Sequence, residues 1–393
     1  MKKLFFAALC LLGAQWAKAQ NERVITTGVP FLLIAADARA AGMGDQGVAT
    51  SSDVYSMQWN PAKYSFALDK HGIGVSYTPY LTSIANDISL GQLNYYNRFH
   101  ERQAFAVSLR YFGLGDIELR QTGDPNEQPV TRNPNEMAVD LAYSLKLSEQ
   151  FAMSVAGRYI RSNLRIPEAS GGGDAKAAST FAFDVAGFYQ SEEEAFEDFN
   201  GRYRLGFNLQ NLGPKISYDN DEELSSNFLP SNLRLGGGFD FIFDEYNKIG
   251  INLETTKLLV PTPQKVEDEN GDGNLTDDYV RESQEYRDIN WVSGIFQSFG
   301  DAPDGFSEEL KEFTYSVGAE YMYQDSFAFR LGYFNESQQK GARRFFSLGA
   351  GFKYTIIKVD VSYLFSASQV RNPLENTLRF SLTFNFGDKY DEL

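Results

Sequence analysis

The densest group of oxygen-bearing side chains lies between residues 268 and 278. Carboxylate and amide residues alternate from Asp268 to Asn274, and Gly273 occupies the sixth position of the pattern. This order matches the first half of an EF-hand calcium loop, which needs oxygen ligands at alternate positions and a glycine for its turn. The twelfth position is Tyr279 instead of a bidentate carboxylate, and Asp278 stands one residue too early.

Two interpretations of this stretch stay open. The first is an acidic, glycine-rich surface turn with no ligand. The second is a possible Ca²⁺ site, and its ligands would be Asp268, Asn270, Asp272, Asn274 and Asp278.

Residue types that carry catalysis are sparse. The chain has two histidines, His71 and His100, and neither a Gly-x-Ser-x-Gly elbow nor a His-Glu-x-x-His helix is present. Cys10 is the single cysteine and lies inside an apolar N-terminal run. We therefore expect no enzyme activity, no catalytic residue and no required cofactor.

The elements that hold these residues are predicted to be β-strands. In the last strand, apolar residues from Leu378 to Phe386 alternate with polar residues from Arg379 to Asn385. A period of two places all apolar side chains on one face of a strand. Fourteen such segments run from about His71 to Phe386. A soluble β-sandwich would show the same alternation, so the strands alone do not decide the fold.

The connections between the strands alternate in length, and together with the export signal described below this favours a membrane barrel over a sandwich. The short set comprises Phe99–Gln103, Leu147–Gln150, Asp244–Asn247, Gln324–Ser326 and Thr355–Ile357, and Ser191–Asn200, of intermediate length, falls in the same phase. The opposite set comprises Leu81–Asn86, Leu114–Pro134, Ile166–Ala178, Gly213–Pro230, Leu259–Lys311, Glu336–Ala342 and Ser368–Glu375. Outer-membrane barrels keep short turns on the periplasmic side and long loops outside. We predict an all-β transmembrane barrel of 14 antiparallel strands over residues 69–393, with both termini periplasmic and the longest loop, 259–311, extracellular.

The N-terminal residues have the features of an export signal. Lys2 and Lys3 precede an apolar run, and Ala17-Lys18-Ala19 fits a small-x-small cleavage site, so residues 1–19 are predicted to be a signal peptide. The alternative is a lipoprotein acylated on Cys10. The formal net charge of −16 argues against nucleic-acid binding, which needs an excess of Lys and Arg.

An apolar stripe lies late in the longest loop. Trp291, Ile295, Phe296 and Phe299 recur at helical spacing, and Phe306 follows. The stripe either folds over the barrel mouth or forms a contact surface for cargo or a partner barrel, since aromatic residues are favoured anchors in interfaces.

Residues 20–68 precede the strands and do not alternate. They contain the Gly42-Met43-Gly44 and Asn60-Pro61-Ala62 motifs, and we expect this segment to form a hatch inside the barrel. Both motifs resemble the N-terminal segment of FadL-like outer-membrane barrels. Residues 31–44 and the stretch Ser298–Phe306 resemble, more closely, the PorV branch of the type IX secretion system of Bacteroidetes.

The PorV resemblance implies a cargo shuttle in the cell outer membrane. Its members would bind the C-terminal signal domain of secreted proteins, take it from the type IX translocon barrel and deliver it to surface attachment (sortase) components. Membrane lipid is then a further partner. The alternative, implied by the wider resemblance, is a FadL-type transporter of hydrophobic small molecules such as long-chain fatty acids.

Overall fold

The computed structural model describes residues 23–82, 85, 87–119, 128–164, 177–218, 226–264, 275–368 and 372–390. The expected signal peptide and residues 268–274 of the possible calcium loop lie outside these ranges. No helix in the described ranges is long and apolar enough to cross a membrane.

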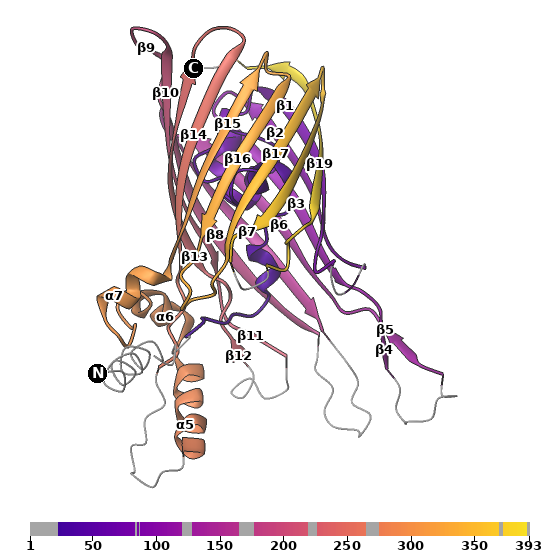
Figure 1. Ribbon diagram of the computed structural model, residues 1–393, viewed down its shortest axis with the longest axis vertical. Coiled ribbons are helices and arrows are strands. Elements are labelled where there is room, and N and C mark those ends of the chain that lie inside the picture. The colour runs from indigo at the N-terminus through magenta and orange to yellow at the C-terminus, as the bar shows by residue number, and fades with distance from the viewer. Residues whose placement is uncertain are drawn as a thin grey trace, which may run out of the picture.

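Fourteen long strands form one closed antiparallel barrel (Figure 1). They are β1 (Asp69–Pro79), β2 (Ile88–His100), β3 (Gln103–Leu114), β6 (Asn135–Lys146), β7 (Phe151–Asn163), β8 (Ala178–Gln190), β10 (Asn200–Leu212), β13 (Asn232–Ile242), β14 (Asn247–Leu258), β15 (Phe313–Tyr323), β16 (Phe327–Asn335), β17 (Arg344–Tyr354), β18 (Ile357–Ser366) and β19 (Leu378–Lys389). The last strand pairs with the first, as in the register Val75 opposite Leu382. This closure satisfies the backbone groups of every wall strand, as a membrane barrel requires. The predicted fold and strand count are confirmed.

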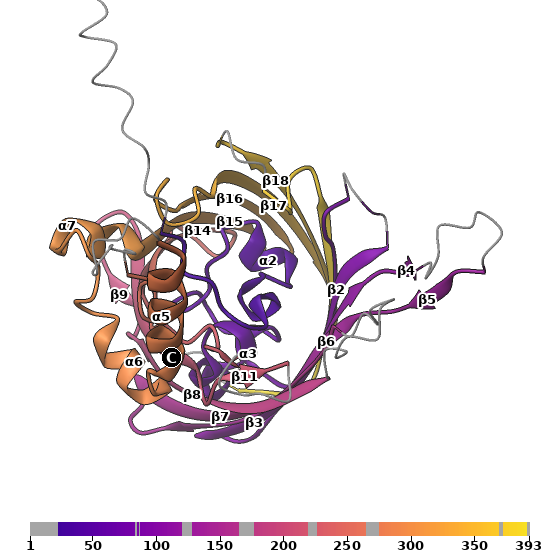
Figure 2. The same cartoon turned by 90° about the horizontal axis from the view of Figure 1, so that it is seen from below.

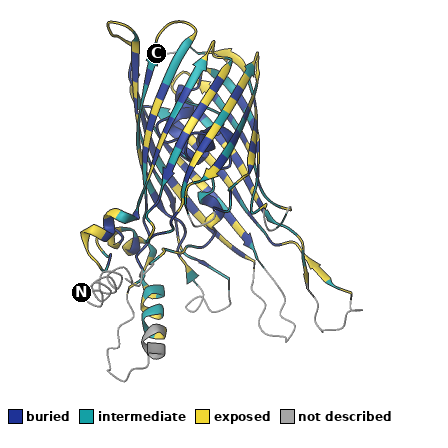
Figure 3. Ribbon diagram, viewed as in Figure 1, coloured by how far each residue is buried: buried dark blue, intermediate teal, exposed yellow. Residues whose placement is uncertain are grey.

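The barrel wall is apolar outside and polar inside. On β16, Phe329 and Leu331 point outward and are 59% and 61% exposed, while Arg330 between them is 2% exposed. The same alternation of buried and exposed residues marks the other strands in Figure 3. Such an outer surface fits hydrocarbon, and the inner polar row must be paired within the lumen.

The predicted alternation of connections is also present. Short turns such as 324–326 and 355–356 lie at one end of the barrel, here called the turn end. Long connections lie at the other end, here called the loop end, and several carry elements of their own. These are the hairpins β4–β5 (Ile117–Leu119, Val130–Arg132) and β11–β12 (Ile216–Ser217, Ser226–Asn227), and the helices α5 (Leu275–Asp288), α6 (Trp291–Gln297), α7 (Phe306–Glu309) and η3 (Leu310–Glu312). The turn between β8 and β10 carries the short strand β9 (Glu194–Ala195).

Residues 23–67, here called the lumen segment, run inside the barrel. The segment contains η1 (Pro30–Leu33), α2 (Ala38–Ala41), α3 (Ser56–Trp59) and η2 (Pro61–Phe66). Figure 2 shows α2 and α3 within the ring of strands. Toward the loop end, Phe31 and Leu32 are each 1% exposed and pack in a cluster with Leu90, Phe112 and Ile160 of the wall.

The two ends of the described chain lie at opposite ends of the barrel. Arg23 contacts Asp304 and Glu308 at the loop end, whereas the Tyr390 amide donates to Leu68 O at the turn end. The expectation that the chain begins and ends on the same side of the barrel is therefore wrong for the described residues 23–390. An even strand count fixes only the two ends of the barrel wall, and the lumen segment crosses the barrel once more before β1.

Candidate functional site

Two parts of the molecule can carry function: the lumen segment, which fills the barrel, and the surface at the loop end. In the lumen segment, the Gly-Met-Gly motif lies against glycines of the wall. A Cβ on Gly42 would stand 3.0 Å from the Cα of Gly349. Gly44 has a φ of +83°, and a Cβ there would stand 2.8 Å from the carbonyl oxygen of Tyr333. Met43 between them is 1% exposed. The motif thus allows backbone-to-backbone contact with β16 and β17, which a side chain would prevent.

The Asn-Pro-Ala motif fixes the second half of the segment. The Asn60 amide group donates to Val48 O and to Gly187 O of β8, both at 2.9 Å, while its side-chain oxygen accepts from the Ala62 amide. Pro61 opens η2, where its missing N–H costs nothing. Ala62 is fully buried, and its carbonyl accepts from Ser144 of β6 at 3.0 Å.

Buried ion pairs join the lumen segment to the wall. Arg39 contacts Glu320 of β15 at 2.8 Å and Asp53 of the segment itself at 2.7 Å. Arg379 of β19 contacts Asp45 at 2.9 Å. Displacing the segment would leave several buried charged groups without partners. This is energetically costly, because a buried charge needs a partner. Ion pairs thus connect the lumen segment to the wall at more than one strand.

At the loop end, the connection between β14 and β15 forms α5, α6, α7 and η3, and Figure 1 shows the first three of these below the strands. Helix α6 lies where the sequence predicts a helical stripe, and the Asn290 side chain caps it through the Val292 amide at 2.9 Å. Its buried position is Gly294, against Phe228 and Pro261. The apolar side chains of the stripe are consequently not buried together on one face of the helix.

The five residues predicted for partner contact divide into two groups. Trp291 and Ile295 are half-buried. Phe296, Phe299 and Phe306 are 75%, 52% and 77% exposed. Figure 2 places α6 outside the ring of strands, so the helix does not lie over the barrel mouth. Of the possible calcium ligands, Asp278 falls within helix α5, and the other four lie outside the described residues.

An ion-pair cluster closes the end of this loop. We call it the loop clasp, and it consists of Arg23, Lys257, Lys340, Glu308, Glu309 and Glu312. Lys257 contacts Glu312 at 2.6 Å and Glu309 at 3.2 Å. Lys340, from the connection between β16 and β17, contacts Glu308 and Glu312, both at 2.8 Å. The clasp thus joins the end of β14, the 336–343 connection and α7.

Arg23 brings the start of the described chain into the same cluster. Its guanidinium donates to Glu308 at 2.9 Å and to Asp304 at 2.7 Å. The side chain of Arg23 is only 9% exposed. The lumen segment is thereby held at the loop end by charge-assisted hydrogen bonds, the stronger class of such bonds.

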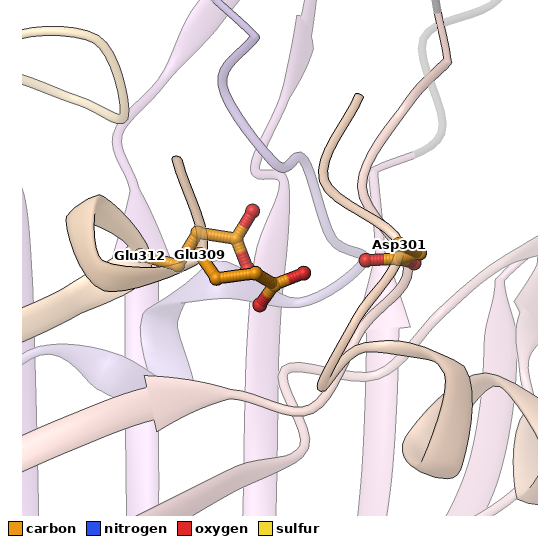
Figure 4. Close-up of side chains that lie close together, drawn as sticks. All are labelled: Asp301, Glu309 and Glu312. Carbon is orange, nitrogen blue, oxygen red and sulfur yellow. The ribbon is translucent and has the colours of Figure 1, made fainter. Parts of the chain in front are cut away.

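Three carboxylates of this region lie close together: Asp301, Glu309 and Glu312 each offer an oxygen within 4.8 Å of the others (Figure 4). Such a group could hold a cation. In this cluster, however, the Lys257 ammonium already contacts both glutamates. The negative charge of the two glutamates is therefore balanced by the protein itself, and these two residues belong to the loop clasp.

The acids of the loop have opposite pKa shifts. Burial would raise the pKa of Glu308, but hydrogen bonds from Arg23 and Lys340 lower it to about 2. The pKa of Glu312 is lowered too, because hydrogen bonds from Lys257 and Lys340 outweigh its burial. Burial raises the pKa of Asp301 to about 6, and one of its carboxylate oxygens has no hydrogen-bond partner in the described chain. Glu308 and Glu312 are thus held as anions at neutral pH.

The comparisons with known proteins identify the family. A model of the type IX secretion system protein PorV matches residues 17–265. The chain belongs to the PorV family. No curated protein sequence matches this chain.

Comparison with solved structures concerns the barrel fold. A deletion mutant of the monoaromatic hydrocarbon channel TodX is 12% identical, with 89% of this chain and 98% of the other covered and a TM-score of 0.51. The toluene transporter TbuX of Ralstonia pickettii is 11% identical over 91% and 100%, with a TM-score of 0.48. At these identities the likeness concerns the fold alone. PorV-family membership makes this protein an outer-membrane component of the type IX secretion system.

Proposed function

We propose that this protein binds the C-terminal signal domain of secreted proteins at its loop end, receives it from the type IX translocon barrel and passes it to the surface attachment components. In this proposal the barrel is not an enzyme and acts by binding, with its loop end outside the cell. The observation that carries the proposal is the match to the PorV family over residues 17–265.

The construction of the barrel supports a binding role. The lumen segment, which we propose acts as the hatch, is joined to the wall by buried ion pairs such as Arg39–Glu320. Because this segment occupies the lumen and is bonded to the wall, we place the binding function on the outer surface of the protein. At the loop end the clasp holds α7 in place while Phe296 and Phe306 remain about three-quarters exposed. Exposed aromatic side chains on a fixed base are suited to anchor a protein partner.

The alternative, transport of a hydrophobic small molecule, needs an apolar site next to the hatch. Phe31 and Leu32 are apolar residues of the hatch, but both are buried against Leu90, Phe112 and Ile160 of the wall. These side chains form packed core in the structure. We therefore favour the secretion role.

The experiment is gene replacement in a secreting strain. We expect Phe296→Ser combined with Phe306→Ser to lower the surface and medium levels of proteins that carry the C-terminal signal domain, because two exposed anchors are removed. Tyr354→Ser, at the turn end and 69% exposed, is the matched control and should leave secretion unchanged. Uptake of a labelled long-chain fatty acid is measured in parallel. Normal secretion in a strain that lacks the gene would refute the proposal, and lost uptake in that strain would support the alternative.

A further inference from the structure

A groove of about 830 Å³ lies on the outer face of the barrel wall, across β3, β6, β7 and β8. Its volume falls within the range of roughly 300–1,000 Å³ typical of ligand sites. Its outward-facing lining residues include Val107, Leu141, Tyr159, Phe181 and Phe183. The lining is almost entirely apolar, and it belongs to the surface that faces membrane lipid.

A missing side chain creates the hollow. Gly157 forms part of the groove, and a Cβ built on it would meet no atom within 4 Å. Its outward-facing neighbours are large and well exposed: Val155 is 58%, Leu141 61% and Phe181 67% exposed. The wall is therefore locally depressed between projecting apolar side chains.

Helix α6 closes the loop-side end of the groove. Trp291, its first residue, lines the groove together with Leu212, Gly213 and Pro214 at the end of β10. Figure 2 shows α6 outside the barrel near β7 and β8. Tryptophan favours the boundary between hydrocarbon and the polar headgroups. The groove thus extends from the middle of β7, at Gly157, to the level expected of a membrane surface.

The chemistry of the lining excludes a polypeptide backbone as the occupant. The Tyr159 hydroxyl is already bonded to Ser179 at 3.2 Å. Asp140 and Arg158 also border the groove, but their side chains are 1% exposed and paired with each other. Backbone N–H and C=O groups placed here would lack partners, which is costly in a membrane. A hydrocarbon chain has no such requirement.

A positively charged side chain lies beyond the loop-side end of the apolar groove. Arg161 is the next outward-facing residue of β7 after Tyr159, roughly 6.6 Å farther along the strand. It is exposed and has no ion pair or hydrogen bond within the described chain. A lipid with one chain in the groove would carry its phosphate to this level, where a guanidinium is a favourable partner.

We propose that the groove holds one acyl chain of an anionic phospholipid of the membrane, with Arg161 at the lipid phosphate. The site is distinct from the loop-end surface assigned above. It rests on the barrel lying in a membrane and not on cargo binding.

Tryptophan fluorescence offers a direct test. If residues 1–19 are removed, the mature chain contains Trp59 and Trp291. Trp59 is 2% exposed in the lumen and serves as an internal reference, while Trp291 lines the groove. Phosphatidylglycerol with brominated acyl chains is titrated into the full-length mature protein in detergent. We expect saturable quenching with about one lipid bound per barrel, and Trp291→Phe should remove it.

Two glycine variants separate the groove from the rest of the wall. Gly157→Phe places a ring in the groove at a position where a Cβ meets no atom within 4 Å, and it should abolish the saturable quenching. Gly91→Phe is the matched control, because Gly91 also lies on the outer face, with the nearest atom 4.0 Å from its Cβ, and it should bind as the original protein does. Arg161→Gln should raise the half-saturating concentration about tenfold.

Three results would overturn the proposal. The first is quenching that rises linearly without saturation. The second is saturable quenching that Gly157→Phe leaves unchanged. The third is a barrel protein that copurifies with the original chain and is lost in Gly157→Phe while lipid quenching persists, which would assign the groove to a protein partner.

Discussion

At the scale of single residues, Gly44 shows how a sequence motif becomes a structural requirement. Its φ of +83° and its approach to the Tyr333 backbone both exclude a side chain. We predict that Gly44→Ala destabilises the barrel by about 2 kcal/mol, since a left-handed backbone and a backbone clash are combined. The measurement is the temperature at which the barrel loses its compact mobility on a gel.

Gly300 provides the comparison for Gly44. A Cβ on Gly300 would meet no atom within 4 Å, so Gly300→Ala should leave the unfolding temperature unchanged. Equal effects of the two variants would show that the Gly-Met-Gly motif does not hold the lumen segment against the wall.

Contacts between residues far apart in the sequence could not be predicted. The motif residues Gly42, Gly44 and Asn60 could be named because the motifs are local. The contact between Arg23 and Glu308 could not, because the two residues are 285 positions apart and no spacing pattern links them. Their pairing depends on the lumen segment reaching the loop end, which the expected position of the N-terminus excluded.

At the scale of elements, period-two alternation made the wall strands predictable and left the loops open. Helix α5 was missed, since residues 275–278 were read as part of a possible calcium loop and the remainder is strongly charged. The hairpins β4–β5 and β11–β12 were missed because each strand is two or three residues long. Strands as short as these do not show a period.

The loop clasp has an expected pH dependence. The pKa of Glu308 is lowered to about 2 from its usual 4.5, so its ion pairs stabilise the loop above pH 4.5 and are lost as the pH falls toward 2. Asp301 has the opposite sign: its pKa is raised to about 6, so acidification from pH 7 to 5 removes an unfavourable charge. We predict that the loop is held most firmly between about pH 4.5 and 6.

A single cysteine can report this pH dependence. Gly300→Cys places a dye on the loop beside the clasp, in a mature chain that otherwise lacks cysteine if residues 1–19 are removed. Dye anisotropy should fall steeply below pH 4. In an Arg23→Gln background the fall should begin at higher pH, because Glu308 loses the donor that lowers its pKa. If the pH profile of the anisotropy is the same with and without Arg23→Gln, Arg23 is not part of the clasp.

At the scale of the whole molecule, the described chain starts at one end of the barrel and finishes at the other. If the loop end faces outward, residues near Arg23 are exposed to the medium. We predict that Val24→Cys, at a position 42% exposed, reacts with a membrane-impermeant maleimide on intact cells. Tyr246→Cys, at the turn end and 52% exposed, should react only after the outer membrane is opened. The reverse labelling pattern would show that the turn end, and not the loop end, faces the medium.

The assignment of the loop end as the cargo-binding surface is tested most directly by site-specific photo-crosslinking in secreting cells. A photoreactive phenylalanine analogue is placed at Phe296 or Phe306, and at Tyr354 as the turn-end control. We predict crosslinks to proteins carrying the C-terminal signal domain from positions 296 and 306, lost when that domain is deleted from the cargo, and none from position 354. Crosslinks from position 354 alone, or crosslinks that persist without the signal domain, would contradict cargo binding at the loop end.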